Sequence, residues 1–221
     1  MRSRFFGFKK PFIALLTPLI HAYKNGHLRS SLTGMSVDRS GNELPWYSLP
    51  AVKFLSQRDY SNATILEFGG GFSTIWWSKR AKQVITFEES AEWINTFMIR
   101  SSPNVRPHLV PVGLKGEQLW SRIHQELSDI EPSKRKFDIV VIDAMHRESL
   151  VDLAFRLVTH DGLVIIDNSE GYNIQRLTGE KHVSRIDFIG PANGVSQQHA
   201  TSIFFNGDNP YLSPKHPIAW D

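Results

Sequence analysis

The sequence predicts an α/β protein with a doubly wound, mostly parallel sheet that ends in a C-terminal antiparallel hairpin strand. Short apolar segments with the character of strands alternate with helical segments from Thr64 onward, and this alternation favours a parallel sheet with helices on both faces. Near the end of the chain, the strand-like segments 182–189 and 201–205 are separated by a loop that has no helical period. A connection without a helix favours an antiparallel pair, because a parallel pair needs a long crossover.

The individual elements follow from the apolar pattern along the chain. Residues 24–45 are rich in Gly, Ser and Asn and are expected to form a loop, after which a helix extends through Leu55. Asp161-Gly162 is expected to turn the chain into the fifth strand. The parallel strands are expected at 64–68, 83–88, about 105–112, 137–142 and 163–166, and the helices near 73–81, 90–100, 116–129, 150–158 and 171–178.

Length and composition indicate one globular domain preceded by a basic segment. The chain has 221 residues, which is long enough for a sizeable core. We divide it into a helical N-terminal segment with a loop, 1–43, and a main domain, 44–221. The chain contains no cysteine, which is typical of a reducing compartment, and the cytoplasm is the expected location.

The basic charge is concentrated at the start of the sequence. Residues 1–37 carry six basic residues and no acid, whereas the rest of the chain holds 19 basic and 22 acidic residues. A slightly acidic main domain does not resemble a nucleic-acid-binding surface, so we expect no nucleic-acid partner. The apolar run 11–20 is too short to span a bilayer, which takes about 20 residues. Two interpretations of residues 1–20 stay open: contact with an anionic membrane surface, or packing on the domain or on a second copy in a homodimer.

The most informative motif is a glycine-rich turn after the first expected strand, TILEFGGGFST over 64–74. Gly69 to Gly71 allow positive φ and a close approach of the backbone to a ligand, and Ser73 or Thr74 is expected to cap the next helix. Glu88 ends the second expected strand, where α/β proteins place an acid against ribose hydroxyls. The pattern therefore predicts a site for an adenosine-containing cofactor.

The spacing of the glycines separates two kinds of cofactor. A dinucleotide fingerprint, G-x-G-x-x-G, would place a glycine where this chain has Thr74. The segment instead resembles motif I, E-x-G-x-G, of the class I S-adenosylmethionine-dependent methyltransferases, which have a Rossmann-like fold. That resemblance implies S-adenosyl-L-methionine as cofactor, held by Glu67, Phe68, Gly69, Gly70, Gly71, Ser73, Thr74, Glu88 and Asp143.

Polar side chains follow the fourth and fifth expected strands, namely Asp143 and the pair Asp167 and Asn168. Ligands of open α/β sheets sit beyond the carboxyl ends of the strands, so we expect these side chains to face one crevice. They resemble the metal ligands of the cation-dependent O-methyltransferases of the catechol, caffeoyl-coenzyme A and macrocin type. That resemblance implies Mg²⁺, Mn²⁺ or Ca²⁺ on Asp143, Asp167 and Asn168, and a small-molecule acceptor such as a sugar or phenolic hydroxyl.

The expected catalytic residues are His146 and Asp143. The same family uses a lysine as general base three residues after the first aspartate, and this chain has His146 there. A histidine titrates near neutrality and suits the removal of a proton from a hydroxyl whose pKa a metal ion lowers. The structural alternatives are that Asp143 only orients the cofactor or caps a helix, and that Asp167 and Asn168 form a turn.

Two other functions stay open at this point. The aminopropyltransferases also carry a G-G-G loop, but they follow it with an acid where this chain has Phe72 and Ser73. A catalytically degenerate binding protein with a methyltransferase fold is the second alternative.

Aromatic residues and the remaining histidines give weaker signals. Trp46 and Tyr47, in the loop before the domain, are expected either in an acceptor pocket or in the core, and Trp76 and Trp77 are expected in the core. His199, like the other histidines, shows no spacing typical of metal ligands and is expected on the surface or in the core.

Overall fold

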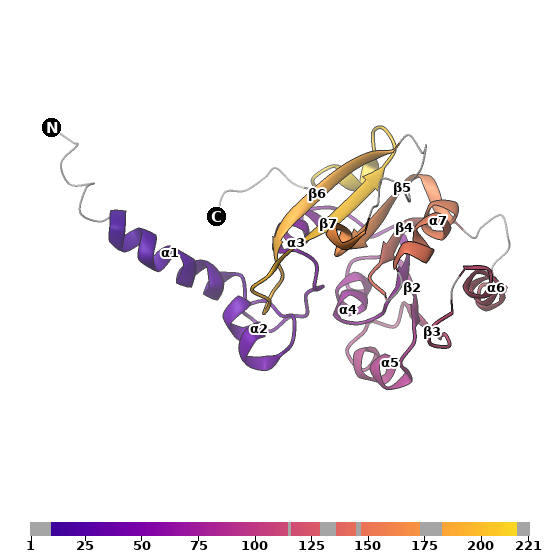
Figure 1. The fold of residues 1–221 in the computed structure, drawn as a ribbon, viewed down its shortest axis with the longest axis horizontal. Coiled ribbons are helices and arrows are strands. Elements are labelled where there is room, and N and C mark those ends of the chain that lie inside the picture. Colours follow the sequence, from indigo (N-terminus) through magenta and orange to yellow (C-terminus); the bar gives the residue numbers. More distant parts are fainter. Residues whose placement is uncertain (1–9, 115, 129–135, 145–146, 173–182, 216–221) are drawn as a thin grey trace.

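The computed structural model describes residues 10–114, 116–128, 136–144, 147–172 and 183–215. A seven-stranded sheet with the order β3-β2-β1-β4-β5-β7-β6 runs through the middle of the molecule (Figure 1). Its strands are β1 Thr64–Phe68, β2 Gln83–Glu88, β3 Val105–Leu109, β4 Phe137–Ile142, β5 Val158–Asp167, β6 Ser184–Pro191 and β7 Gln198–Phe205.

The pairing of the strands confirms the predicted sheet. Strands β1 to β5 are parallel to one another, whereas β7 pairs antiparallel with both β5 and β6. The last strand therefore begins at the edge of the sheet where the parallel strands end, and Thr201 lies opposite Asp167.

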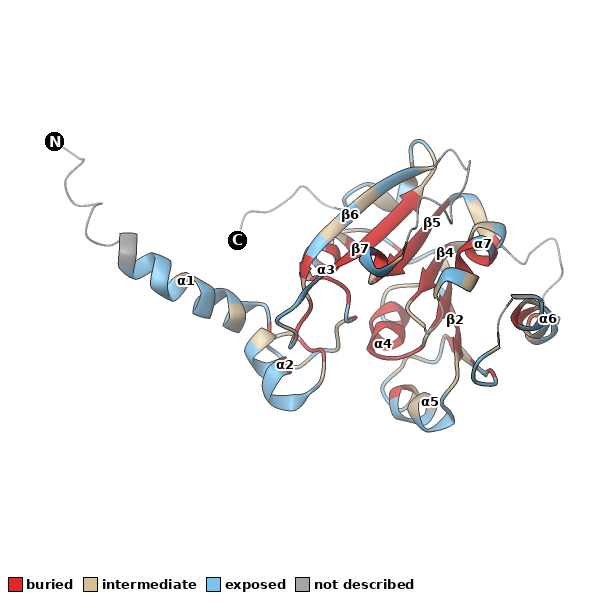
Figure 2. Cartoon of the chain, viewed as in Figure 1, coloured by how far each residue is buried: buried red, intermediate tan, exposed pale blue. Residues whose placement is uncertain are grey.

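Helices cover both faces of the sheet, as the alternation predicts. The helices are α1 Lys10–Lys24, α2 His27–Thr33, α3 Leu49–Leu55, α4 Phe72–Ser78, α5 Ala91–Met98, α6 Gly116–Glu126 and α7 Arg147–Leu157, with short 3₁₀ turns η2 Ser169–Gly171 and η3 Pro210–Leu212. One apolar cluster joins the sheet to α6 and α7, and a second joins its other face to α3 and α4, including the fully buried Trp76 and Trp77. Figure 2 shows the strands of the sheet as mostly buried, with exposed helix surfaces around them.

Two elements differ from the expectation. Helix α2 lies inside the expected loop 24–45, between Gly26 and Gly34, which both adopt left-handed φ values of 80° and 68°. The buried Ser30 hydroxyl donates to the Val37 carbonyl at 2.9 Å and holds this helix against the following chain. Composition alone does not reveal such a short helix, because its stability comes from this tertiary contact.

The fifth strand also starts earlier than expected, since Asp161 and Gly162 belong to β5. A side chain at Gly162 would lie 2.6 Å from the Asp138 carbonyl, so glycine serves close packing at a register shift between β4 and β5. The helix expected at 171–178 falls largely outside the described residues.

Candidate cofactor and acceptor site

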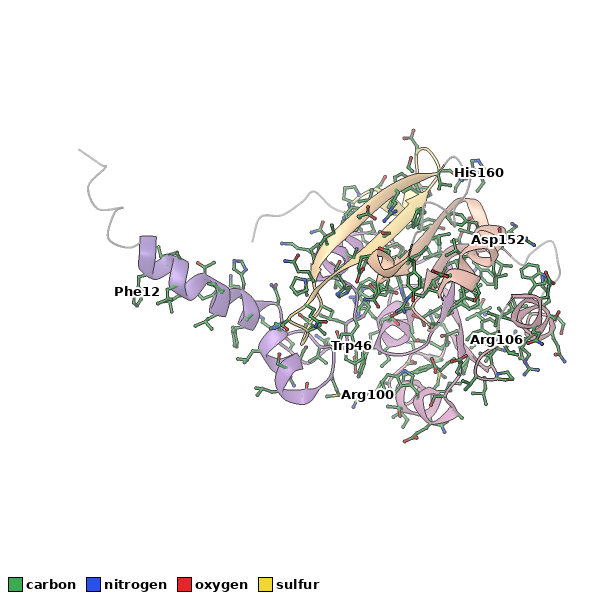
Figure 3. All side chains as sticks on the ribbon, viewed as in Figure 1. Phe12, Trp46, Arg100, Arg106, Asp152 and His160 are labelled. Atoms are coloured by element: carbon green, nitrogen blue, oxygen red, sulfur yellow. The ribbon has the colours of Figure 1, made fainter. Side chains whose placement is uncertain are left out.

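A cavity of about 510 Å³ lies at the carboxyl ends of the parallel strands. Its volume is in the range of pockets that enclose a small molecule or cofactor. One half is lined by the glycine-rich loop after β1 and by Glu88, and we call it the cofactor half after the ligand expected there. The other half, which we call the acceptor half, is lined by residues that follow β4 and β5 and by residues of the β6–β7 hairpin. Trp46, labelled in Figure 3, also lines the cavity, and its indole N–H donates to the Asn193 carbonyl at 3.2 Å. The next residue along the chain, Tyr47, is fully buried in the core.

The glycine-rich loop passes directly against the end of β4. Gly69 has a φ of 90°, and a Cβ there would lie 2.2 Å from the Asp143 carbonyl oxygen. The Gly69 N–H donates to the Phe87 carbonyl at 2.9 Å, and the Asp143 N–H donates to the Phe68 carbonyl at 2.8 Å. Only glycine fits this position, because a side chain would meet both an unfavourable backbone conformation and the neighbouring strand.

Glu67 and Thr74 organise the loop from behind. The Thr74 hydroxyl donates to the Glu67 carboxylate and accepts from the Gly71 N–H at 2.8 Å. Both side chains are completely buried, and neither lines the cavity. Burial raises the pKa of Glu67 to about 7, although the hydroxyls of Ser73 and Thr74 oppose the shift. Helix α4 begins at Phe72, so the expected caps Ser73 and Thr74 lie within its first turn.

Glu88 and Trp93 bound the cofactor half of the cavity. Glu88 is half-buried at the end of β2, and one of its carboxylate oxygens accepts from the Ser90 N–H at 2.9 Å. The Trp93 indole N–H donates to the Gly70 carbonyl at 2.6 Å, and its ring meets Phe72 edge-on at 5.7 Å. Glu88 therefore lines the cavity next to the loop, and the hydrogen bond from Trp93 holds the loop at Gly70.

An arginine links the polar side chains in the acceptor half. The Nη2 atom of Arg147, in α7, donates to Asp143 Oδ1 at 2.8 Å and to Asn168 Oδ1 at 2.9 Å. Asn168 adopts a left-handed φ of 50°, which directs the chain out of β5 into η2. Asp167, next to it, accepts from the Thr201 hydroxyl at 2.6 Å.

The two carboxyl groups in this half are held where charge is costly. Burial raises the pKa of Asp143, and the nearby charge of Asp167 raises it further, while Arg147 opposes the shift. Burial likewise raises the pKa of Asp167, against the hydrogen bond from Thr201 and the charge of Arg147. Such groups, in a cavity, are typical of functional sites.

His199 joins this cluster from the antiparallel strand β7. Its Nε2 atom lies 3.7 Å from Asp167 Oδ1 and has no hydrogen-bond partner within the described part of the chain. The side chain is 9% exposed and lines the cavity. The expectation that His199 belongs to the surface or an inert core position was therefore incomplete.

The structure does not support the expected metal site. The Arg147 guanidinium already donates to Asp143 Oδ1 and Asn168 Oδ1, so a cation at those two oxygens would have to displace a like charge. Within the described ranges, no group of three or more His, Asp or Glu side chains is arranged to hold a metal ion. The expected base, His146, lies outside the described residues.

The cavity brings together most of the expected site residues. The residues that line it include Phe68, Gly69, Gly70, Gly71, Ser73, Glu88, Asp143, Asp167 and Asn168. Sequence reasoning missed the roles of Arg147, Trp93 and His199 at this site. The i, i+4 spacing of Asp143 and Arg147 at a helix start was the one local signal for the ion pair.

The fold, rather than the sequence, connects the chain to known proteins. Neither a protein-family model nor a curated protein sequence matches it. A tRNA (m1A58) methyltransferase from Aquifex aeolicus matches with a TM-score of 0.52 and 15% identity, over 79% of this chain and 72% of that one. Precorrin-6y C5,15-methyltransferase from Geobacter metallireducens matches with a TM-score of 0.52 and 11% identity, over 72% and 88%.

A third match covers a smaller share of the matched protein. A Streptococcus mutans protein assigned to the S-adenosylmethionine-dependent methyltransferases matches 69% of this chain at 11% identity and a TM-score of 0.49, and the chain covers 46% of its length. The protein has the fold of the class I S-adenosylmethionine-dependent methyltransferases. The matches do not single out the cation-dependent O-methyltransferases within that class.

The comparison corrects the prediction about the acceptor. We expected a small molecule and no nucleic acid, from the slightly acidic main domain and from the resemblance to O-methyltransferases. A tRNA methyltransferase shares this fold, so the fold gives no ground for restricting the acceptor in that way. Net charge averages over the whole surface and does not describe the part of it that meets an acceptor.

Proposed function

We propose that the protein transfers the methyl group of S-adenosylmethionine to a hydroxyl oxygen of an acceptor bound in this cavity. The observation that carries the proposal is the loop of Gly69 to Gly71, packed on the end of β4 and facing the same cavity as Glu88. The Glu88 carboxylate, which lines the cavity, would accept hydrogen bonds from the ribose hydroxyls. The loop backbone and Phe68 would hold the amino-acid part and the edge of the nucleoside.

The charge of the cavity supports a cationic cofactor. When bound, S-adenosylmethionine supplies an activated methyl group on a positively charged sulfonium. Glu88, Glu89, Asp143 and Asp167 line the cavity, against the single guanidinium of Arg147 and the imidazole of His199. Opposite charges attract most strongly in a partly desolvated site, so this surplus of carboxylates favours a cationic ligand.

The acceptor half contains groups that could act as the general base. A hydroxyl must lose its proton as its oxygen attacks, and His199 lies beside the buried Asp167, which would orient the ring and stabilise its charged form. His146 stays a second prediction for the same role. Arg147 holds Asp143 and Asn168 in fixed positions, so that the floor of the acceptor half is preorganised.

Calorimetry with S-adenosylhomocysteine tests the cofactor. We expect binding by S-adenosylhomocysteine and none by NAD, and tighter binding than by decarboxylated S-adenosylmethionine, which an aminopropyltransferase would prefer. Glu88→Gln should weaken binding about tenfold or more, the loss expected for hydrogen bonds to a charged group. Glu92→Gln, which removes the same charge from the exposed start of α5, is the matched control and should bind like the wild type. Equal binding of NAD would overturn the assignment.

Transfer of a labelled methyl group tests the chemistry. The protein is incubated with methyl-labelled S-adenosylmethionine and a cell extract that includes RNA, protein and glycan fractions, and the labelled products are analysed for O-methyl groups. His199→Gln should lower transfer by about 10²–10⁴-fold with S-adenosylhomocysteine binding unchanged. His160→Gln, at a fully solvated histidine, is the control. Cofactor binding without transfer to any fraction would identify a degenerate binding protein instead.

A further inference from the structure

Helix α1 projects from the body of the protein. Figure 1 shows it extending away from the sheet, with α2 between it and the rest of the molecule. Its principal neighbour among the described elements is α2. Phe12, near its start, points into the surroundings in Figure 3. The helix therefore buries little of its own apolar surface within this chain.

The exposed apolar side chains of α1 lie along one side. At 3.6 residues per turn, Phe12, Leu15, Leu16, Leu19, Ile20 and Tyr23 fall on a single face, and Phe12, Leu15 and Leu19 are 65%, 71% and 66% exposed. Thr17, His21 and Lys24 fall on the opposite face. A soluble surface helix normally turns its apolar side toward the core, so this arrangement is the reverse of ordinary packing.

The charge of this region has one sign. Arg2, Arg4, Lys9, Lys10, Lys24 and Arg29 are the ionised side chains of residues 1–37, and the first acid is Asp38. A helix that combines an apolar face with basic residues, and that is too short to cross a bilayer, is suited to lie in the interface of an anionic membrane. With its 15 residues α1 is too short, and within the described ranges no helix reaches the length and apolarity needed for a span.

We propose that α1 docks the protein on an anionic lipid bilayer, with its Phe12–Leu19 face inserted among the acyl chains and its basic residues against the headgroups. This inference stands independently of the proposed methyl transfer. Charge complementarity selects the bilayer over two other occupants. A second copy would bring two sets of six like charges together, and RNA would match the charge but leave the apolar face in water.

Co-sedimentation with vesicles tests this proposal on the full chain. We expect binding to vesicles of phosphatidylcholine mixed with phosphatidylglycerol, weaker binding at high salt, and little binding to phosphatidylcholine alone. The double variant Leu15→Gln with Leu19→Gln should need at least about tenfold more anionic lipid for half-binding, because two inserted leucines are lost. The matched control, Thr17→Gln with His21→Gln, makes the same number of changes on the opposite face and should bind like the wild type.

Other results would overturn the proposal. Equal loss in both double variants, or no sedimentation of the wild type at low salt, would exclude insertion of this face. A dimer in light scattering that the Leu15→Gln, Leu19→Gln variant converts to a monomer would assign the face to a second copy. Binding of tRNA that responds to the same variant would assign it to nucleic acid. An unchanged melting temperature and unchanged S-adenosylhomocysteine binding in both variants would show that the body remains folded.

Discussion

The two halves of the cavity are built in different ways. The cofactor half is made mainly of backbone from one short segment, 67–74, whose close packing requires glycine. The acceptor half is made of side chains that come from β4, α7, β5 and β7 and hold one another through ion pairs and hydrogen bonds. The cofactor half therefore depends on shape and the acceptor half on charge, and each can be disturbed separately.

The largest expected effect is the loss of shape in the cofactor half. Gly69→Ala should lower the free energy of unfolding by about 4 kcal/mol or more and abolish S-adenosylhomocysteine binding, because its Cβ would lie 2.2 Å from the Asp143 carbonyl oxygen. Gly113→Ala is the matched control: its φ of 81° is similar, but no atom lies within 4 Å of the added Cβ. It should cost only about 1–2 kcal/mol, the strain of the left-handed conformation. Urea denaturation measures both, and equal losses would contradict the importance of the close approach.

Loss of charge compensation in the acceptor half should rank next. Arg147→Met should cost about 3 kcal/mol above neutral pH, because it leaves the partly buried Asp143, whose side chain is 20% exposed, without its partner. Since burial already raises the pKa of Asp143, the cost should shrink as pH falls and that carboxyl group becomes protonated. Arg156→Met, which breaks an exposed ion pair with Asp152 in the same helix, should cost less than about 1 kcal/mol. A pH-independent loss would show that the arginine acts only by packing.

The pH dependence of stability distinguishes the halves further. The pKa of Glu67 is raised in the folded state to about 7, so its contribution to stability is complete at low pH and is lost as pH rises through that value. Glu67→Gln should therefore remove about 2 kcal/mol of the decline between about pH 5.5 and 8. Glu92→Gln should leave the profile unchanged, because that side chain is exposed. Parallel profiles for Glu67→Gln and the wild type would mean that Glu67 titrates normally.

The smallest expected effect concerns the hydrogen bond that Trp93 donates to the glycine-rich loop. Trp93→Phe keeps an aromatic ring beside Phe72 but removes the donor to the Gly70 carbonyl. We expect a loss of about 1 kcal/mol in the free energy of unfolding and a modest loss in S-adenosylhomocysteine affinity. An affinity loss as large as that of Glu88→Gln would mean that Trp93 contacts the cofactor itself.

This contrast explains what the sequence could predict. The alternation of strands and helices along the chain, the antiparallel end of the sheet and the cofactor half depend on local patterns: strand apolarity, a helix-free connection and a contiguous glycine motif. The acceptor half depends on which distant residues the fold brings together. Asp167 and His199 are remote in the sequence, but Asp167 Oδ1 and His199 Nε2 lie 3.7 Å apart, and no local spacing reveals that contact.

The structure gives no support to the expected metal site, for a related reason. Asp143, Asp167 and Asn168 carry the right oxygens at the right strand ends, but their chemistry depends on a fourth side chain. Arg147 supplies a permanent positive charge to two of these groups. The sequence contained the arginine, yet only the folded structure shows that its guanidinium reaches both oxygens.

The reversed direction of β7 has a consequence for how this site can change. A parallel last strand would start at the opposite edge of the sheet, whereas β7 begins beside the ends of β4 and β5. The connection that joins it to β6 therefore contributes Ala192 and Val195 to the cavity, and β7 itself contributes His199. Insertions or substitutions in a hairpin of this kind are tolerated by the sheet that carries it. The residues that line the acceptor half thus belong to other elements than those that line the cofactor half. A mutation in one half can therefore leave the other half intact.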